Sequence, residues 1–344
     1  PPTPPPSSNR RQRQMCIRDR FKEIVRPTDV HRGVMKVDVD RCTSCGLCVD
    51  NCPFKCWKME EGGYPELRDD YICFSCSNCM VPCPTDAISI AETYRVTSGF
   101  WATEPHPLPV KMPLPPRDKD GNLDEWNAVE RAVLERRSVR NFSDEPVPDH
   151  LIRRVLEAGR FAPSAGNCQP WEFIVITDRA LIAKMDEAIW TMMNGLWATY
   201  KDDELVKAMA PVAETTPYAF EPRALWGGVS TIVRREMLAS LNAPCVILLV
   251  GDSRAISGPE LNMGICGENM NLVANSLGIR ACWNGFLVSG VPAIADKIPL
   301  EPNWRVITTL VLGWPTFKQD GIVAREYRPV RWLREGSDAV EIEE

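Results

Sequence analysis

Short apolar runs and helix-spaced apolar residues alternate through the C-terminal two thirds of the chain. Runs of strand length occur at Phe173–Thr177, Pro244–Val250, Arg280–Asn284 and Val306–Leu312. Leu261–Leu277 is typical of a long buried helix, and Gly278 stands where helices commonly end. This alternation predicts an α+β domain over residues 126–335, with helices packed against a sheet.

Two shorter helices are predicted before the first of these strands. Asp124 is the predicted N-cap of the first helix, and Asp149 is the predicted N-cap of the second. Their apolar sides hold Ala128, Val129, Ala132 and Val133 in the first helix, and Ile152, Val155, Leu156 and Gly159 in the second.

The first third of the chain shows neither pattern. Residues 33–93 are rich in cysteine and poor in long apolar runs, so this module has little core and would depend on metal to fold. The many prolines of residues 94–125 predict an extended linker. Residues 1–32 are predicted to be a disordered tail, partly non-native because QMCIRDR resembles a translated sequencing adapter. Residues 336–344 form an acidic tail.

Composition narrows the functional classes. Of the 344 residues, 44% are hydrophobic and 25% charged, as in ordinary globular proteins, and the net charge of −6 argues against a nucleic-acid partner. No apolar run approaches the ~18–20 residues that cross a bilayer, so no membrane partner is predicted. The arginine-rich N-terminus lacks the apolar stretch of a signal peptide, and the cytoplasm is the predicted location.

Fourteen cysteines need a separate explanation, and eight of them fall into two runs of identical spacing. The runs are Cys42, Cys45, Cys48 and Cys52, then Cys73, Cys76, Cys79 and Cys83, each followed directly by proline. Three closely spaced thiolates suit one face of an iron–sulfur cubane, which a distant fourth thiolate completes. Structural zinc is the alternative, but zinc takes only four ligands and explains a duplicated run less well.

The duplicated run resembles bacterial two-cluster ferredoxins over residues 33–93. The resemblance implies two [4Fe–4S] clusters whose fourth ligands are exchanged. Cys42, Cys45, Cys48 and Cys83 would hold one cluster, and Cys73, Cys76, Cys79 and Cys52 the other. Clusters with four cysteine ligands carry single electrons and leave no open site, so substrate chemistry is expected elsewhere. Cys56, just past the first run, is predicted to be a packing or surface thiol.

Four motifs follow one another in the C-terminal part: RRSVR (136–140), APSAGNCQPW (162–171), LGIRACWNG (277–285) and LGWP (312–315). The first is a candidate anion site, because guanidinium groups bind phosphate bidentately. The second offers backbone N–H groups and small polar side chains to a flat ligand. In this order the motifs resemble the nitroreductase family of FMN enzymes over residues 126–332. The resemblance implies FMN as cofactor and a homodimer.

The same resemblance assigns roles to single residues. Arg136 and Ser138 match phosphate and ribityl contacts, and Arg140 matches a basic residue near the flavin N1–O2 edge, where a cation stabilises the reduced anionic ring. Asn284 and Gly285 match the loop whose backbone N–H faces the flavin N5. The loop along the ring is matched by Pro163, Ser164, Ala165 and Asn167. Arg325 matches a phosphate ligand, while a second basic position holds Tyr327, with Arg328 adjacent. Arg137 and Gln169 complete the predicted cofactor-binding set.

Residues 186–236 are longer than a connection between core elements requires. In nitroreductase-like folds this insertion covers the exposed face of the flavin, so it is predicted to be a lid over a flat, electron-poor substrate. Helix packing or the dimer interface is the alternative. Its aromatic and methionine residues are Trp190, Met192, Met193, Trp197, Tyr200, Met209, Tyr218, Phe220 and Trp226.

The predicted function is an FMN-dependent oxidoreductase without a catalytic side chain, because no histidine belongs to a nucleophile signature and the flavin carries the chemistry. An external ferredoxin, or NAD(P)H, would supply electrons. The two clusters would pass them to FMN, and FMN to a small nitroaromatic, quinone, activated alkene or halogenated compound. One alternative reverses the flow, from NAD(P)H to a protein partner. Another is a redox carrier or sensor without a small-molecule substrate.

Overall fold

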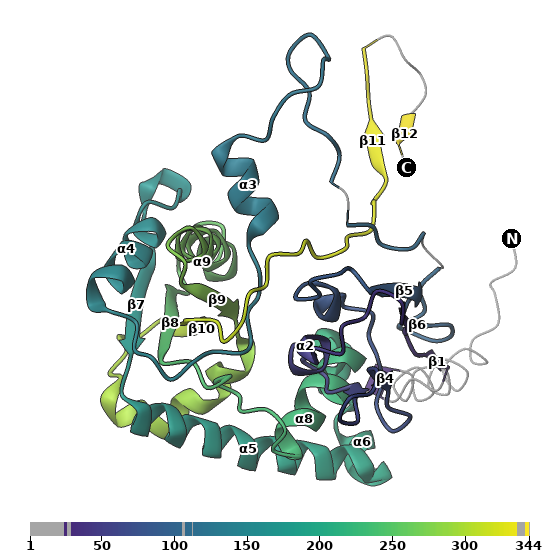
Figure 1. Ribbon diagram of the computed structural model, residues 1–344. Helices are drawn as coiled ribbons and strands as arrows, with labels where there is room; N and C mark the ends of the chain where they lie inside the picture. The colour runs from purple at the N-terminus through teal and green to yellow at the C-terminus, as the bar shows by residue number, and fades with distance from the viewer. Residues whose placement is uncertain (1–23, 26–28, 105–106, 112, 336–340, 344) are drawn as a thin grey trace, which may run out of the picture.

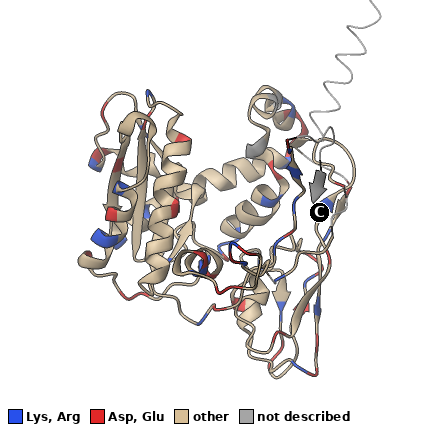
Figure 2. Ribbon diagram, turned by 90° about the horizontal axis from the view of Figure 1, so that it is seen from above, with Lys and Arg blue, Asp and Glu red and all other residues tan. Residues whose placement is uncertain are grey.

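The computed structural model describes residues 24–343 apart from 26–28, 105–106, 112 and 336–340. Figure 1 shows two units side by side: a larger one built around a sheet, and a smaller one that carries the cysteine runs. The predicted α+β domain is confirmed in the larger unit. In Figure 2, acidic and basic residues are interspersed over both units. No helix in the described part of the chain is long and apolar enough to cross a membrane.

The larger unit contains a four-stranded antiparallel sheet with the order β7-β8-β10-β9. The strands are β7 (Trp171–Ile176), β8 (Cys245–Asp252), β9 (Arg280–Trp283) and β10 (Trp304–Gly313). All four lie within two residues of the predicted bounds at each end. β8 is an inner strand whose residues 245–251 are all buried, which explains its continuous apolar run.

Successive residues of β8 face two different cores, as the pleat of a strand requires. Val246 and Leu248 belong to the core on the side of α5 (Arg179–Lys201) and η5 (Gly285–Lys297). Ile247 belongs to the core on the side of α4 (Asp149–Arg160) and α9 (Pro259–Ser276). The sheet is therefore covered by helices on both faces.

The helix starts differ from the sequence predictions. Helix α3 (Ala128–Glu135) is capped by Asn127 rather than Asp124: the Asn127 side chain accepts from the Glu130 backbone N–H, and Glu130 accepts from that of Asn127. This reciprocal pair satisfies two N–H groups, which Asp124 is too far upstream to do. The Asp149 prediction is also wrong, since the N-cap position is Pro148 and no side chain caps α4. Gly278 follows α9 with φ +77°, as predicted for a helix end.

Between α5 and β8 the chain forms a series of short helices. They are α6 (Asp203–Ala208), α7 (Ala210–Thr215), η3 (Pro217–Phe220), η4 (Arg223–Val229) and α8 (Ser230–Val233). Figure 1 shows α6 and α8 beside the smaller unit. This segment is therefore a bridge between the two units.

The smaller unit consists of short antiparallel pairs and two brief helices. The pairs are β1 (Val30–His31) with β6 (Arg95–Val96), β2 (Val34–Val37) with β5 (Ile88–Glu92), and β3 (Trp57–Lys58) with β4 (Glu66–Leu67). The helices are α2 (Leu47–Asp50) and η1 (Asn78–Met80). Pairing thus extends into residues 95–96, which were expected to belong to the linker.

Both predicted tails lie partly outside the described residues. Within residues 1–32, Ile24 and Val25 are buried in a cluster with Val206 and Phe220 of the bridging segment. Near the other end, β11 (Val330–Trp332) pairs with β12 (Glu341–Glu343). Upstream of β11, Arg325 forms an antiparallel bridge with Val110 of the proline-rich segment, with N–O distances of 2.9 Å in both directions.

Candidate functional site

A cavity of about 310 Å³ lies where the two units meet. The smaller unit contributes Pro53, Phe54, Cys76 and Asn78. The larger unit contributes Arg140, Arg223, Ala224, Gly228, Met237, Ala239, Leu241, Cys282, Trp283, Asn284, Gly285 and Phe286. Three predicted flavin contacts, Arg140, Asn284 and Gly285, therefore share one cavity with a predicted cluster ligand, Cys76.

The loop from β9 to η5 is held rigidly at this cavity. The buried Asn284 side chain donates from Nδ2 to the Ala239 carbonyl over 2.5 Å and accepts from the Phe286 N–H over 3.2 Å. Its backbone N–H donates to the Thr309 carbonyl over 2.9 Å. Gly285 begins η5, so its N–H has no acceptor within that helix. Asn284 thus positions the loop, and the Gly285 N–H is available to a ligand.

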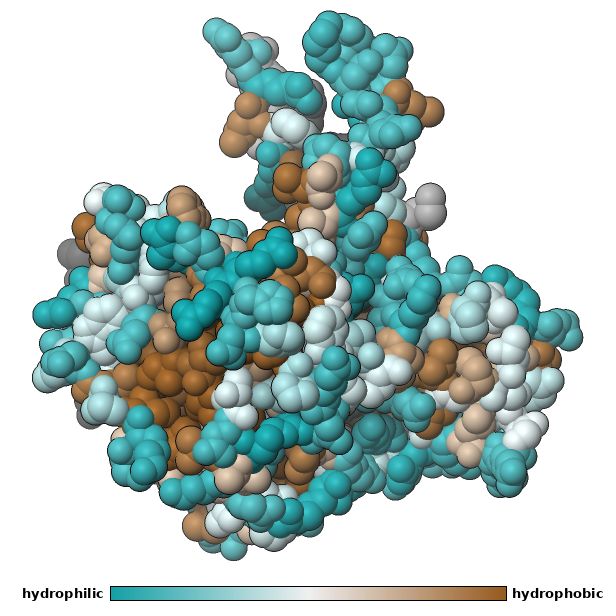
Figure 3. Space-filling view, turned by 60° about the vertical axis from the view of Figure 1, so that its left-hand side comes forward, coloured by the Kyte–Doolittle hydropathy of each residue, from teal (hydrophilic) through white to brown (hydrophobic). Residues whose placement is uncertain are grey.

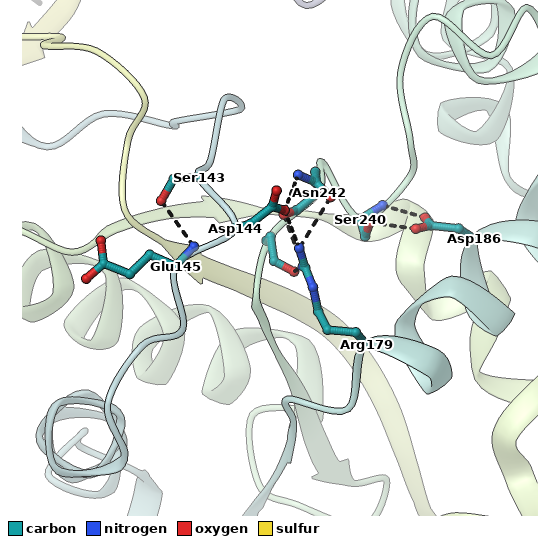
Figure 4. A network of polar contacts seen from close by, with 8 residues as sticks. Ser143, Asp144, Glu145, Arg179, Asp186, Ser240 and Asn242 are labelled. Atoms are coloured by element: carbon teal, nitrogen blue, oxygen red, sulfur yellow. Dashed lines mark hydrogen bonds and ion pairs between the residues drawn. The ribbon is translucent and has the colours of Figure 1, made fainter.

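A second buried contact supports the far side of this loop (Figure 4). Asp186 of α5 accepts from the Ser240 N–H over 2.7 Å and from the Ser240 hydroxyl over 2.6 Å. Burial raises the pKa of Asp186, and the bonds from Ser240 oppose that rise. Because Ala239 precedes Ser240, this contact fixes the carbonyl to which Asn284 donates.

Four guanidinium groups lie close enough together for their charges to interact, at Arg136, Arg137, Arg280 and Arg325. Burial, followed by the charges of Arg136, Arg280 and Arg325, lowers the pKa of Arg137 to about 10. Burial and Arg136 also lower the pKa of Arg325. Glu268 offsets part of this charge through a 3.2 Å contact with Arg136. The buried Nη2 of Arg137 has no hydrogen-bond partner among the described residues, so the cluster suits a phosphate group.

Arg140 connects this part of the site with the cysteine-rich unit. Its Nη1 donates to the Ser138 carbonyl over 3.1 Å, which directs the side chain along the wall. Its charge favours the ionised forms of Cys76 and Cys282, although burial raises the pKa of both thiols, that of Cys76 to about 11. Cys282 is buried and hydrogen-bonds to the Trp283 carbonyl, so it is a packing residue.

The cysteines of the two runs come together in the exchanged pattern. Burial and the Cys45 thiol, with a smaller effect of Cys83, raise the pKa of Cys48 to about 12. Burial raises the pKa of Cys79 too, and the thiols that add to this rise are Cys76, Cys52 and Cys73. The neighbours of each thiol thus belong to the set that the ferredoxin resemblance assigns to it. No three His, Cys, Asp or Glu side chains in the described residues converge on one metal-ion position.

Cys56 lies against the second set of thiols. It is 2% exposed, and its thiol donates to the Ile72 carbonyl over 3.1 Å. Its backbone N–H donates to the Cys52 sulfur over 3.3 Å. Hydrogen bonding from Cys56 lowers the pKa of Cys52, and burial opposes this effect. Cys56 therefore hydrogen-bonds to a ligand position.

The loop Pro163–Gln169 does not line this cavity. Most of it is exposed, and Gly166, Asn167 and Gln169 have φ of 59°, 52° and 48°. Ser164 holds the turn by accepting from the Gln169 N–H over 3.0 Å. The loop has a defined shape, but within one chain it forms no wall beside Arg140 and Asn284.

Arg328 and the aromatic residues of segment 186–236 also lie away from the cavity. Arg328 pairs with Glu326 over 2.5 Å and lines a different cavity, with Tyr94 and Trp101. Core packing involves Trp190, Met193, Trp197, Tyr200 and Trp226, so for these residues the lid prediction is wrong and helix packing is right. The segment reaches the cavity through Arg223, Ala224 and Gly228.

Several residues of the site gave no usable signal in the sequence. Phe54 and Phe286 have no motif of their own, although Phe54 follows the Cys52–Pro53 pair that ends the first cysteine run. Arg280 lies within the LGIRACWNG motif, and the parallel bridge between Ser138 and the next residue, Ala281, brings it to the arginine cluster. Arg223 gives no local signal, because an arginine in a connecting segment is usually solvated.

Comparison with protein-family models matches residues 133–314 to the nitroreductase family. Residues 35–58 match the 4Fe-4S binding domain, which covers the first cysteine run.

Individual relatives match the larger part of the chain. A protein of Archaeoglobus fulgidus, whose name combines NADH dehydrogenase with NAD(P)H nitroreductase, is 48% identical over 208 residues, which are 60% of this chain and 96% of that protein. A nitrobenzene nitroreductase of Ectopseudomonas oleovorans is 25% identical over 202 residues, 54% of this chain and 86% of the relative. A nitroreductase from Desulfitobacterium hafniense, crystallised with bound FMN, is 20% identical, covers 58% of this chain and 96% of its own, and has a TM-score of 0.47.

Proposed function

Because this chain belongs to the nitroreductase family and also carries a 4Fe-4S binding segment, we propose that it is an oxidoreductase in which electrons pass from the cysteine-rich unit to an FMN in the 310 Å³ cavity. One observation carries the proposal: Cys76 lines the same cavity as Arg140, Asn284 and Gly285. A cluster held by Cys76 would have no protein layer between its ligand and that cavity.

The residues of the cavity and the neighbouring arginines that precede Arg140 in the chain, together with Arg325, suit FMN. Arg136 and Arg325, from the arginine cluster, would bind the phosphate, with Ser138 beside them. Arg140 would stand at the pyrimidine edge of the ring, and the Gly285 N–H would point to its N5. When bound, FMN supplies hydride or single-electron transfer, and the protein supplies orientation and charge. The apolar part of the wall, which includes Phe54, Leu241 and Phe286, would help to exclude water from the ring.

The two thiol sets suit two [4Fe–4S] clusters. Cys52, Cys73, Cys76 and Cys79 would hold the one nearer the cavity, and Cys42, Cys45, Cys48 and Cys83 the other. Cys45 is exposed, which makes the second set the natural entry point for electrons from an external donor. We place the protein in the cytoplasm, where thiolate ligands stay reduced.

The acceptor we propose is a small, flat, electron-poor molecule: a nitroaromatic, quinone, activated alkene or halogenated compound. Names such as nitrobenzene nitroreductase among the relatives support the first of these. The name of the Archaeoglobus relative supports NAD(P)H as a second possible donor besides a ferredoxin. Phe286, Met237 and Phe54 give the cavity apolar walls for such a molecule, and Arg223 adds a cation.

We further propose a homodimer in which the loop Pro163–Gln169 completes the cavity of the second copy. The loop has a defined shape, yet it forms no wall of the cavity in its own chain. Figure 3 shows hydrophobic side chains gathered on one face of the larger unit, and exposed apolar residues of that unit include Phe161, 70% exposed, and Leu261, 57% exposed. Sedimentation of the holoprotein as a monomer would contradict the dimer.

An anaerobic absorbance titration of iron-reconstituted protein tests the proposal, together with iron, sulfide and FMN analysis. We expect about eight irons and one FMN per chain. Reduced ferredoxin should bleach both chromophores, and a nitroaromatic or enoate should reoxidise them. If NAD(P)H alone reduces the flavin and electrons leave only to a protein acceptor, the reversed flow is correct instead.

A further inference from the structure

Two adjacent glycines, Gly227 and Gly228, lie between the two units. They belong to η4, a π-helix, and both are buried. A Cβ atom at Gly227 would lie 2.5 Å from two ring atoms of Phe54 in the cysteine-rich unit. A Cβ atom at Gly228 would lie 2.5 Å from the ring of Phe286 in the β9–η5 loop. The backbone of the two glycines is therefore packed between two aromatic rings, and both rings line the cavity.

Phe54 is firmly tied to the thiol set nearest the cavity. It follows Cys52 by two residues and packs edge-on against Phe74, with ring centroids 4.8 Å apart. Phe74 in turn follows Cys73 and packs against Tyr94, also at 4.8 Å. A displacement of the Phe54 ring would therefore move the backbone that carries Cys52 and Cys73.

The π-helix is itself stabilised at this point. Its wider turn leaves carbonyl groups that an α-helix would use. The buried Ser230 hydroxyl donates to the Trp226 carbonyl over 2.6 Å, and the Thr231 hydroxyl donates to the Gly228 carbonyl over 2.9 Å. The backbone of Gly227 and Gly228 is thus fixed in place and cannot easily yield to an added side chain.

We propose that Gly227 and Gly228 are positioning residues that set the distance between the cysteine-rich unit and the flavin cavity, and thereby the rate at which electrons enter it. The inference rests on the proposed function. Each transfer oxidises the donor cluster by one electron and reduces the flavin by one, so two transfers, with protons from water, complete the flavin's reduction. Electron tunnelling weakens exponentially with distance. A methyl group at Gly227 would lie 2.5 Å from the Phe54 ring and 3.0 Å from the Phe74 ring, so the aromatic packing of the cysteine-rich unit must shift away from η4 to admit it.

The test compares G227A with G195A in anaerobic stopped-flow reduction by reduced ferredoxin. A Cβ atom at Gly195 of α5 would meet nothing within 4 Å beyond its own helix backbone, so alanine fits there. We expect G195A to match the wild type. G227A should keep its iron and FMN but show several-fold slower flavin bleaching after the clusters are reduced, with unchanged reduction by dithionite. Equal flavin rates in G227A and the wild type would overturn the inference.

A readout independent of activity is the coupling between Gly227 and Phe54 in thermal unfolding of the holoprotein. F54A removes the ring that the new methyl group meets, so the double variant G227A/F54A should lose less Tm than the two single variants together, and should recover part of the electron-transfer rate. If the Tm losses are additive and the rate does not recover, the contact between Gly227 and Phe54 does not set the electron-transfer rate.

If G227A does not retain its clusters, G228A replaces it in the stopped-flow experiment. The methyl group of G228A would meet Phe286 instead of Phe54, and this variant should also slow flavin bleaching. Failure of the proposed function gives a different result: in the wild type itself, reduced clusters would leave the flavin oxidised. That outcome would overturn both proposals. If instead the flavin is reduced in the wild type and at the same rate in G227A and G228A, only the role of the glycines is overturned.

Discussion

Arg325 and Arg328 lie three residues apart, yet their surroundings differ completely. Arg325 lies near Arg136, whose charge, after burial, lowers the pKa of Arg325, and its side chain donates to the Ala324 carbonyl at a long 3.5 Å. Arg328 is mostly exposed and paired with Glu326. Arg325 matches the family's basic phosphate ligand by position, whereas the second basic position holds Tyr327 and Arg328 is only adjacent to it. Only the first has an electrostatic environment in which an anion would stabilise the protein.

Replacement of Arg325 by alanine should weaken FMN binding by roughly 10-fold or more, because a hydrogen bond to a charged group contributes about 1.5–3 kcal/mol. Titration of apoprotein with FMN, followed by flavin fluorescence, measures the change in Kd. Arg328→Ala is the matched control and should leave the Kd within about twofold, as expected of an exposed ion pair. Equal effects of both substitutions would argue against the arginine cluster as the phosphate site.

At the scale of elements, the contact between the units depends on a polar group as well as on the glycines. The Tyr71 hydroxyl of the cysteine-rich unit donates to the carboxylate of Glu236. Arg68 and Arg234 stack against its ring, at 3.9 Å and 4.5 Å from the centroid. Glu236 directly precedes Met237, which lines the cavity. Docking of the smaller unit is thus coupled to the shape of the site.

This contact should make the docking sensitive to alkaline pH. Burial, then the bond to Glu236, raises the pKa of Tyr71 above its ordinary value, while Arg234 opposes the rise. Because the pKa of Tyr71 is higher in the folded than in the unfolded protein, its hydroxyl stabilises the folded state fully below about pH 10. This stabilisation is lost as the pH rises through the folded-state pKa. Tyr71→Phe should lower stability at pH 8 by about 1–3 kcal/mol, since Glu236 then lacks its donor.

Denaturant unfolding of the holoprotein at about pH 8 and about pH 10.5, on either side of the ordinary tyrosine pKa, measures both effects. The difference in the free energy of unfolding between the wild type and Tyr71→Phe should be smaller at the higher pH. An advantage that stays constant or grows with pH would show that the Tyr71 hydroxyl does not stabilise the contact as a donor to Glu236.

The elements themselves were predictable where apolar periodicity dominates. The strands of the sheet and helix α9 followed from runs that only a buried element tolerates. The helix starts were not predictable, because Asp124 and Asn127 are both good N-cap residues. The choice between them depends on which one reaches Glu130. The arginine motif and cysteine runs were recognisable because their ligand sets are local in sequence. Phe54 and Gly227 were not, since they lie far apart in the sequence and their contact exists only in the folded chain.

At the scale of the whole molecule, the site belongs to neither unit alone. The family domain supplies the arginine cluster and the Asn284–Gly285 loop, while the cysteine-rich unit forms the remaining wall with Phe54 and Cys76. Residues 186–236, which were expected to be an aromatic lid, instead pack Trp190, Trp197 and Trp226 against the core and bring Gly227 and Gly228 between the units. This arrangement places the Cys76 thiol on the same cavity as Arg140 and Asn284, which is the observation on which the proposed electron path rests.

The most direct test is anaerobic stopped-flow reduction of Cys76→Ser by reduced ferredoxin. Serine disturbs only the cluster nearer the cavity, and photoreduction serves as the control that the flavin remains reducible. We predict that this variant keeps its FMN, and that the flavin stays oxidised on the timescale in which the wild type is reduced. Flavin reduction at the wild-type rate, with the cluster held by Cys76 lost, would contradict an electron path through the cysteine-rich unit.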